Sequence, residues 1–288
     1  MTDELWTIRR VLQWTTGFFK DKGLDGPRLD AELLICDALS LDRIRLYTDH
    51  DRPLSSEELS GIRERVRRRS KHEPVAYITG KRGFWKHDLK VDRRVLIPRP
   101  DTERLVELAL SLLAEGGPHR LVDVGTGSGA IALALAGDVD NLIVLAIDRS
   151  GGALEVAREN ARSLGLEDRV TFAEGDLLGP ARDFGPTIIV SNPPYISTSE
   201  VDALMPDVLD FEPRLALDGG PDGLELVRRL IADAPALLPP GGHLLLEHGH
   251  DQGEAVLALV RADGRYEEAR TEKDYGRRDR VMVARTRA

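Results

Sequence analysis

The sequence predicts an α/β fold in which a seven-stranded, mostly parallel sheet follows a small helical bundle and a β-hairpin. Helical patterns fill the first 73 residues, short β-rich stretches follow from Pro74, and beyond residue 98 strand-length and helix-length apolar patterns alternate. Such alternation is typical of a parallel sheet covered by helices on both faces. We therefore expect three parts, at residues 1–73, 74–98 and 99–288.

The first part carries helical signals and almost no strand signal. Apolar residues keep helical spacing from Leu29 to Leu41, and a capping box of Ser55 with Glu58 begins a later helix. The single cysteine, Cys36, excludes an internal disulfide and is most simply a small core residue. The basic run 63–71 could touch RNA, but such a run is more often a solvated helix face.

The second part, from Pro74, has turn glycines at Gly80 and Gly83 between β-rich stretches and ends in Pro-Arg-Pro. This pattern indicates a β-hairpin that connects two domains. An amphipathic helix should follow, with Asp101 as its N-cap.

The third part supplies the sheet. Five apolar strands are expected at 121–124, 142–147, 170–174, 187–192 and 243–249, with helices between most of them. Residues 266–287 form two polar-apolar strands around a glycine turn, which predicts an antiparallel hairpin at the sheet edge. The expected total is seven strands.

Charge and composition narrow the function. The chain of 288 residues has 40 basic and 49 acidic residues, a net charge of −9, which gives no sign of an extended basic face for nucleic acid. No apolar run approaches the ~20 residues of a membrane span, and residues 1–10 lack the apolar core of a signal peptide. We expect a cytoplasmic protein.

A glycine loop follows the first strand of the third part. Gly125, Gly127 and Gly129 lead directly into a helix, where glycines let the backbone turn and approach a ligand, and the helix N-terminus offers free N–H groups. About 20 residues later the second strand ends in Asp148, where a carboxylate can bind ribose hydroxyls. Loop and acid together indicate an adenosine-containing cofactor, although Asp148 could instead cap the next helix.

Further polar residues end neighbouring strands. The carboxyl ends of parallel strands open into one crevice, so Asp123, Asp148, Asp176 and Asn192 should face it together. Asp176 could meet an adenine amino group, or it could be a loop carboxylate in solvent.

The fourth strand stops abruptly at Asn192, Pro193, Pro194 and Tyr195. Two prolines remove two backbone donors and fix two φ angles, so a paired strand cannot continue. This rigid stop suits methyl transfer to a nitrogen that carries two hydrogens: the Asn192 oxygen and the Pro193 carbonyl can accept both N–H groups and orient a poor nucleophile. Tyr195 offers a flat face to a planar amide or base.

Other interpretations of these residues stay open. The Asn-Pro-Pro-Tyr stop alone does not separate a glutamine amide from an adenine or cytosine amino group, and it could be a rigid turn with a packed tyrosine. The glycine loop also occurs in nucleotide-binding modules without catalysis. His248 and His250 could suggest a metal, but no third ligand is spaced for it, and a strand end with solvated histidines is the simpler interpretation.

Several motifs together resemble a known family. These are "PVAYITGKRGFW", "VLIPRPDTERLVE", "VDVGTGSGAIALALA", "SNPPYI", "FEPRLALDGGPDGLE", "LLLEHGHDQGEAV" and "DYGRRDRVMV". Their order resembles that of the bacterial peptide chain release factor glutamine methyltransferases over residues 74–283, and the helical part also fits.

The resemblance implies a seven-stranded Rossmann-like methyltransferase domain with its last strand antiparallel. It implies methylation of the glutamine in the Gly-Gly-Gln motif of release factors, with S-adenosylmethionine as donor. Cofactor binding would fall to Asp148, Asp176, Leu177, Asn192 and the loop, whose residues are Gly125, Thr126, Gly127, Ser128 and Gly129. The amide would be held by Asn192, Pro193, Pro194 and Tyr195.

The resemblance also implies supporting roles. An aromatic residue stands at the position of Leu177 in some relatives, so the adenine-side contact here would be apolar. Glu212 and Pro213 would be structural or lie on the substrate side. The helical part would dock the release factor, and we expect a monomer, no stable nucleic-acid binding and no metal.

A duplex DNA substrate would require base extrusion, for which the chain has no added recognition segment.

Overall fold

The computed structural model describes residues 5–114 and 119–287, which form two compact units. The first is helical and comprises residues up to Gly80 together with Pro206–Phe211, and the second comprises Lys81–Met205 and the chain from Glu212 onward. Across the described ranges, none of the helices has the length and apolar character needed to cross a membrane.

The first unit is a bundle of short helices. They are α1 (Ile8–Asp21), α2 (Pro27–Leu39), α3 (Arg45–Thr48), α4 (Ser56–Arg69) and α5 (Val75–Thr79), with α10 (Pro206–Leu209) added from far along the chain. Phe19, Leu34, Ile35 and Ile62 fill the core, and Cys36 is a buried free thiol, as predicted. The predicted capping box is confirmed, because Ser55 and Glu58 exchange hydrogen bonds at the start of α4.

The basic run at the end of α4 is largely neutralised. Its arginines form ion pairs with acidic side chains of the same unit: Arg65 with Asp37, Arg67 with Glu64, Arg68 with Glu73, and Arg69 with both Asp30 and Asp207. Most arginines of the run are therefore engaged in ion pairs within the helical unit.

The segment after Pro74 corrects one expectation. Residues 75–79 were expected to be β-rich but form α5, between Pro74 at its N-cap and Gly80 at its C-cap, where φ is +73°. Ala76, Tyr77 and Ile78 are all buried, so packing overrides their local strand preference. The predicted hairpin begins later, with β1 (Lys81–Phe84) paired antiparallel to β2 (His87–Lys90).

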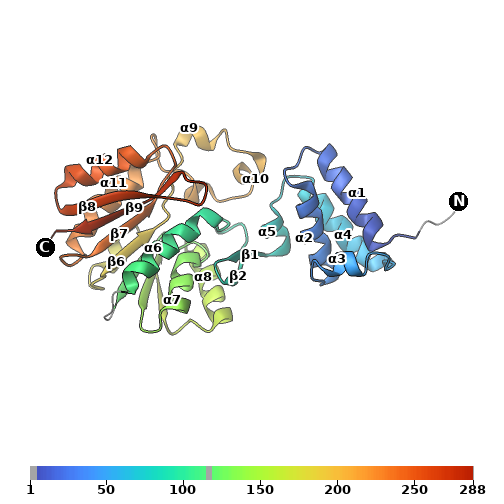
Figure 1. Ribbon diagram of the computed structural model, residues 1–288, viewed down its shortest axis with the longest axis horizontal. Helices are drawn as coiled ribbons and strands as arrows, with labels where there is room; N and C mark the ends of the chain where they lie inside the picture. Colours follow the sequence, from blue (N-terminus) through green and yellow to red (C-terminus); the bar gives the residue numbers. More distant parts are fainter. Residues whose placement is uncertain (1–4, 115–118, 288) are drawn as a thin grey trace. The chain divides into compact units, whose positions relative to one another are not determined.

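The second unit contains the seven-stranded sheet, as predicted. Its strands are β3 (Arg120–Val124), β4 (Ile143–Asp148), β5 (Val170–Glu174), β6 (Ile188–Ser191), β7 (His243–Glu247), β8 (Tyr266–Lys273) and β9 (Asp279–Thr286). Their order is β5-β4-β3-β6-β7-β9-β8. The first five are parallel, and β9 lies antiparallel between β7 and β8, so the C-terminal hairpin closes that edge (Figure 1).

Helices connect these strands. They are α6 (Glu103–Leu113), α7 (Ala130–Asp138), α8 (Gly151–Leu164), α9 (Thr198–Val201), α11 (Glu225–Asp233) and α12 (Gly253–Asp263), with 3-10 turns at Pro100–Thr102, Gly179–Ala181, Arg214–Ala216 and Ala234–Ala236. Asp101 is not the N-cap of α6 as expected, because it lies inside a 3-10 turn and Thr102 takes the cap position.

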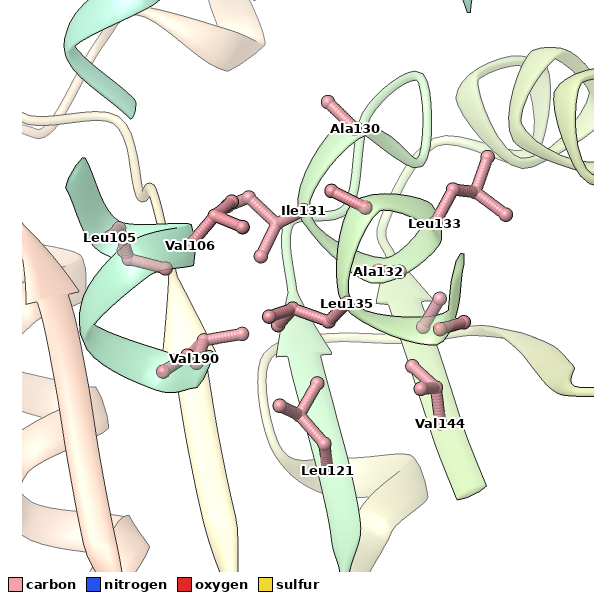
Figure 2. Packing of buried hydrophobic residues seen from close by; sticks show 14 of the residues in the cluster. Leu105, Val106, Leu121, Ala130, Ile131, Ala132, Leu133, Leu135, Val144 and Val190 are labelled. Carbon is pink, nitrogen blue, oxygen red and sulfur yellow. The ribbon is translucent and has the colours of Figure 1, made fainter. Parts of the chain in front are cut away.

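Two apolar cores cover the two faces of the sheet. Leu121 of β3 and Val144 of β4 belong to one core with α6 and α7, whereas Val122 and Leu145 belong to the other with α11 and α12. Figure 2 shows the first core, where Val106 of α6 and Ile131 of α7 meet above strands β3 and β6. Because consecutive residues of the central strands enter opposite cores, the polar residues of a ligand site are expected at the strand ends.

Candidate active site

The pocket lies at the carboxyl ends of the central strands. The chain runs from β3 to β4 and β5 on one side and returns as β6 on the other side of β3, so the strand order reverses there. Ligands of open α/β sheets bind at such a reversal. Among the residues that line the pocket are Gly125, Gly127, Asp148, Asp176, Leu177, Asn192, Pro193 and Pro194, which brings most of the predicted site together.

The glycine loop forms one wall. The Gly125 and Thr126 amides donate to the Ile147 carbonyl at 2.8 and 3.0 Å, which fixes the loop against the end of β4. Gly125 and Gly127 have φ of +72° and +56°, and a Cβ on either would meet no atom closer than 4.0 Å. Glycine suits both positions because it adopts this left-handed backbone conformation without strain. The space beside each Cα is open, and both residues line the pocket.

The other loop residues lie behind this wall and not on it. Thr126 Oγ1 donates to Asp123 Oδ2 at 2.6 Å, and the Ser128 carbonyl accepts from Asn160 Nδ2 at 2.9 Å. A Cβ on Gly129 would lie 2.9 Å from Leu133 Cδ1, so this glycine permits close packing at the start of α7. These three residues support the loop, and their direct contact with a cofactor stays a prediction.

Two carboxyls flank the loop, Asp148 half-buried at the pocket and Asp123 fully buried. Asp148 accepts from the Gly127 amide at 2.8 Å and from the Ser150 amide at 2.9 Å, and burial raises its pKa against the effect of these bonds. Asp123 is fully buried, and burial raises its pKa to about 7. Within the described ranges its Oδ1 has no hydrogen-bond partner, which leaves a polar atom unsatisfied beside the loop.

Asp176 and Leu177 follow β5. Asp176 is exposed and pairs with Arg229, whose hydrogen bond lowers the pKa of the carboxyl. Leu177 has φ of +47°, a conformation that leucine rarely adopts, and it lines the pocket next to the apolar core. The apolar contact expected at position 177 is thus available, whereas Asp176 would need to leave Arg229 to bind adenine.

The Asn-Pro-Pro-Tyr segment is held from several sides. Ser191 Oγ donates to the Val124 carbonyl at 2.7 Å, and Gln252 Nε2 donates to the Tyr195 carbonyl at 2.9 Å. A Cβ on Gly219 would lie only 2.6 Å from the Pro194 carbonyl oxygen, so the glycine-rich segment after Leu217 packs directly on this backbone. The segment is therefore rigid beyond what its two prolines impose.

A polar network behind this segment was not predicted. Asn192 Nδ2 donates to Thr102 Oγ1 at 3.1 Å, and the Tyr195 hydroxyl donates to Glu247 Oε1 at 3.4 Å. Burial raises the pKa of Glu247 to about 7. The sequence signal was a glutamate that ends the apolar strand "HLLLE", at the same sheet edge as Asn192.

The remaining predicted residues, His248, Glu212 and Pro213, are described by the contacts they make. His248 was expected to be solvated, but it is buried. Its Nδ1 lies 2.8 Å from the Gly249 carbonyl oxygen, and its Nε2 lies 3.4 Å from Thr271 Oγ1. Across residues 5–114 and 119–287, no three His, Cys, Asp or Glu side chains are grouped as a metal site requires. Glu212 is buried against Arg99 and the Ile97 amide, and Pro213 lines the pocket.

These surroundings fit an adenosine-containing group. The open glycine wall admits a close ligand, Asp148 can accept from hydroxyls, and Leu177 supplies an apolar contact. The residues that would hold such a group are therefore present, and Asn192 lies on the same pocket wall. Asp123 was expected to face the crevice with the other acids but does not line the pocket, because it is fully buried and bonded to Thr126 and the Ala132 amide behind the loop.

Known proteins resemble the chain in both units. Residues 10–80 match the model of the PrmC N-terminal domain, and residues 104–209 match that of the methyltransferase small domain. A release factor glutamine methyltransferase of Geobacter sulfurreducens is 45% identical over 284 residues, which cover 98% of each chain.

Two solved structures are also similar. The release factor-specific protein-(glutamine-N5) methyltransferase of Alicyclobacillus acidocaldarius is 31% identical, with a TM-score of 0.43, over 69% of this chain and all of that one. A methyltransferase of Pyrococcus furiosus is 20% identical, with a TM-score of 0.51, over 70% of this chain and 89% of that one, and shares the fold. Given the near-complete match to the Geobacter relative, the chain belongs to the family of release factor glutamine methyltransferases.

Proposed function

We propose that the chain transfers a methyl group from S-adenosylmethionine to the side-chain amide nitrogen of the glutamine in the Gly-Gly-Gln motif of peptide chain release factors. The observation that carries this proposal is the amide of Asn192, which lines the pocket together with the glycine loop and whose Nδ2 donates to the buried Thr102 hydroxyl. Its other atom, Oδ1, is then the acceptor that a two-hydrogen nitrogen requires.

The cofactor residues of this proposal lie on three strand ends. The loop Gly125, Thr126, Gly127, Ser128 and Gly129 would receive the amino acid part, with the helix N-terminus of α7 behind it. Asp148 would bind the ribose hydroxyls, and Asp176 and Leu177 would meet the adenine. When bound, the cofactor supplies an electrophilic methyl group on a positively charged sulfur and becomes S-adenosylhomocysteine.

The catalytic work of the chain is to orient a weak nucleophile. The lone pair of an amide nitrogen is delocalised, so its attack is slow unless the plane and the N–H directions are fixed. Asn192 Oδ1 and the Pro193 carbonyl would accept one N–H each, and both also favour the positive charge that develops on the nitrogen. Tyr195 would lie against the amide plane, and the proton would leave after methylation has made the nitrogen acidic.

The helical unit is proposed to dock the release factor. It is a separately packed unit, and its basic run is engaged in ion pairs. These pairs and the net charge of −9 support a protein partner over nucleic acid. We further propose a monomer that works in the cytoplasm.

The test is methyl transfer from labelled S-adenosylmethionine to a purified release factor, by the wild type and by Asn192→Ala. We expect the variant to lose at least about 100-fold in kcat, comparable to removal of one oriented catalytic group. Equal labelling by both proteins would contradict the role of Asn192.

The controls separate substrate from mechanism. A release factor whose target glutamine is replaced should accept no label from the wild type. Labelling that survives this replacement, or that appears in DNA or RNA instead, would favour the alternative of a nucleic-acid amino methyltransferase, which shares the Asn-Pro-Pro-Tyr segment.

A further inference from the structure

Asn192 directly follows β6, beside a glutamate that ends β7. Ser191 pairs with Leu246 in the parallel register of these strands, so the next residues, Asn192 and Glu247, follow side by side at the same edge of the sheet. Glu247 is only 1% exposed, and within the described part of the chain its Oε2 has no hydrogen-bond partner. A buried carboxyl at the end of a catalytic strand has a desolvation cost that calls for a function.

Thr102 lies between the two side chains. Its Oγ1 accepts from Asn192 Nδ2 at 3.1 Å. Because this bond uses a lone pair of the hydroxyl, its own hydrogen can turn to the buried Glu247 carboxyl, whose Oε2 is unsatisfied within the described ranges. Consistent with this direction, the Thr102 side chain lowers the Glu247 pKa that burial raises. Thr102 is the N-cap residue of α6, but its side chain makes no capping bond, so the hydroxyl is free for this contact.

The direction of the hydroxyl decides the orientation of the amide. A hydroxyl has one hydrogen, and when that hydrogen points to Glu247 only lone pairs remain for Asn192. The amide must then turn its NH₂ group to Thr102 and its Oδ1 away from it. The flipped amide would present N–H groups to the N–H groups of the acceptor nitrogen, which cannot bind them.

We propose that Thr102 and Glu247 are positioning residues that hold the Asn192 amide with its Oδ1 toward the acceptor nitrogen. This inference rests on the proposed function, in which that nitrogen belongs to a glutamine side chain. Tyr195 also donates to Glu247 Oε1 at 3.4 Å, so the same carboxyl holds the other end of the Asn-Pro-Pro-Tyr segment directly.

The kinetic test compares Thr102→Val, Thr102→Ser and wild type, with the release factor as acceptor. Valine keeps the shape of threonine and removes the hydroxyl, so we expect kcat to fall about 10-fold with KM for the release factor changed less than about 3-fold. Serine restores the hydroxyl and should recover kcat to within about 3-fold. Thr15→Val is the matched control, because Thr15 is buried in the helical unit and its Oγ1 has no partner among the described residues.

Two readouts do not depend on turnover. The side-chain NH₂ signal of Asn192 in nuclear magnetic resonance spectra should shift in Thr102→Val and return in Thr102→Ser, whereas the affinity for S-adenosylmethionine by calorimetry should stay within about 3-fold. An unchanged NH₂ signal, an unchanged kcat, or a fall in kcat matched by lost cofactor affinity would each overturn the positioning role.

The pH dependence of kcat adds a third readout. Ionised Glu247 can only accept, whereas the protonated form and Glu247→Gln can also donate and so release the hydroxyl. The wild type should gain kcat as the pH rises through about 7, and Glu247→Gln should lack that rise. Tyr195, Arg280 and Asp101 are the other ionisable groups around Glu247, and they and Asp123 are present in both proteins. Identical pH profiles would contradict the role of Glu247.

Failure of this inference is distinguishable from failure of the proposed function. If the wild type does not methylate the release factor, the function is wrong while the NH₂ signal still reports the contact with Thr102. If the wild type methylates it and Thr102→Val does so equally well, only the inference is wrong.

Discussion

Two buried glutamates, one in each unit, have opposite surroundings. Glu32 of the helical unit is 2% exposed and Glu247 of the catalytic unit is 1% exposed. Glu32 accepts from Arg28 at 3.0 Å, from Arg43 at 2.5 Å and from Tyr47, whereas Glu247 has Tyr195 at 3.4 Å and one oxygen without a partner among the described residues.

The pKa values follow these surroundings. Burial acts to raise the pKa of Glu32, but the bonds from Tyr47, Arg43 and Arg28 outweigh it and the pKa is lowered. Burial of Glu247 prevails over its weaker contacts and raises its pKa to about 7. A fully paired carboxylate stabilises a fold, whereas an incompletely satisfied one at a strand end indicates a functional site.

The largest expected effect is the pH dependence of stability that Glu247 causes. Its folded pKa of about 7 exceeds its ordinary value of 4.5, so the folded state binds the extra proton. The contribution of Glu247 to the free energy of unfolding is full below pH 4.5. It is lost as the pH rises through about 7, and the loss amounts to up to about 3 kcal/mol. Denaturant unfolding at several pH values should show this loss in the wild type and a smaller loss in Glu247→Gln. If the free energy of unfolding depended on pH equally in the two proteins, the assignment of this loss to Glu247 would be wrong.

Glu32→Gln should have the next largest effect, and on stability alone. Its partners Arg28 and Arg43 are 65% and 56% exposed and can be hydrated after the change, so we expect a loss of about 2 kcal/mol in the free energy of unfolding. Because the Glu32 contribution is lost as the pH falls, the deficit should shrink on acidification. The kcat with saturating release factor should not change, and a fall in kcat would break the contrast with Glu247.

The smallest effect belongs to the exposed pair of Arg67 and Glu64. These side chains are 58% and 54% exposed, so the pair is strongly screened by solvent. Arg67→Ala should change the free energy of unfolding by less than about 0.5 kcal/mol, and salt should abolish the difference. If Arg67→Ala lowered the free energy of unfolding as much as Glu32→Gln, solvent exposure would not explain the difference between the two ion pairs.

The sequence predicted features whose signals are local. The strand ends with Gly125, Asp148 and Asn192 were predictable because apolar runs, glycine spacing and a double proline each constrain a few adjacent residues. The helix at 75–79 was missed because buried packing of Tyr77 and Ile78 outweighs their local preference.

Longer-range features of the site could not be predicted. The contact between Thr102 and Asn192 joins residues 90 positions apart and depends on the strand register and on the position of α6. His248 was expected in solvent because a strand end is usually exposed, yet it is buried, with its amide bonded to the Arg280 carbonyl of β9 and its ring near Thr271 of β8. Such placements follow from the tertiary packing of several elements and leave little local signal.

The most direct test of the account is to locate the transferred methyl group. Wild-type protein, S-adenosylmethionine and a purified release factor should be incubated together and the product digested and sequenced by mass spectrometry. The account predicts one added methyl group, on the side-chain amide nitrogen of the glutamine in Gly-Gly-Gln. A methyl group on any other residue, or an unmodified release factor alongside methylated nucleic acid, would contradict it.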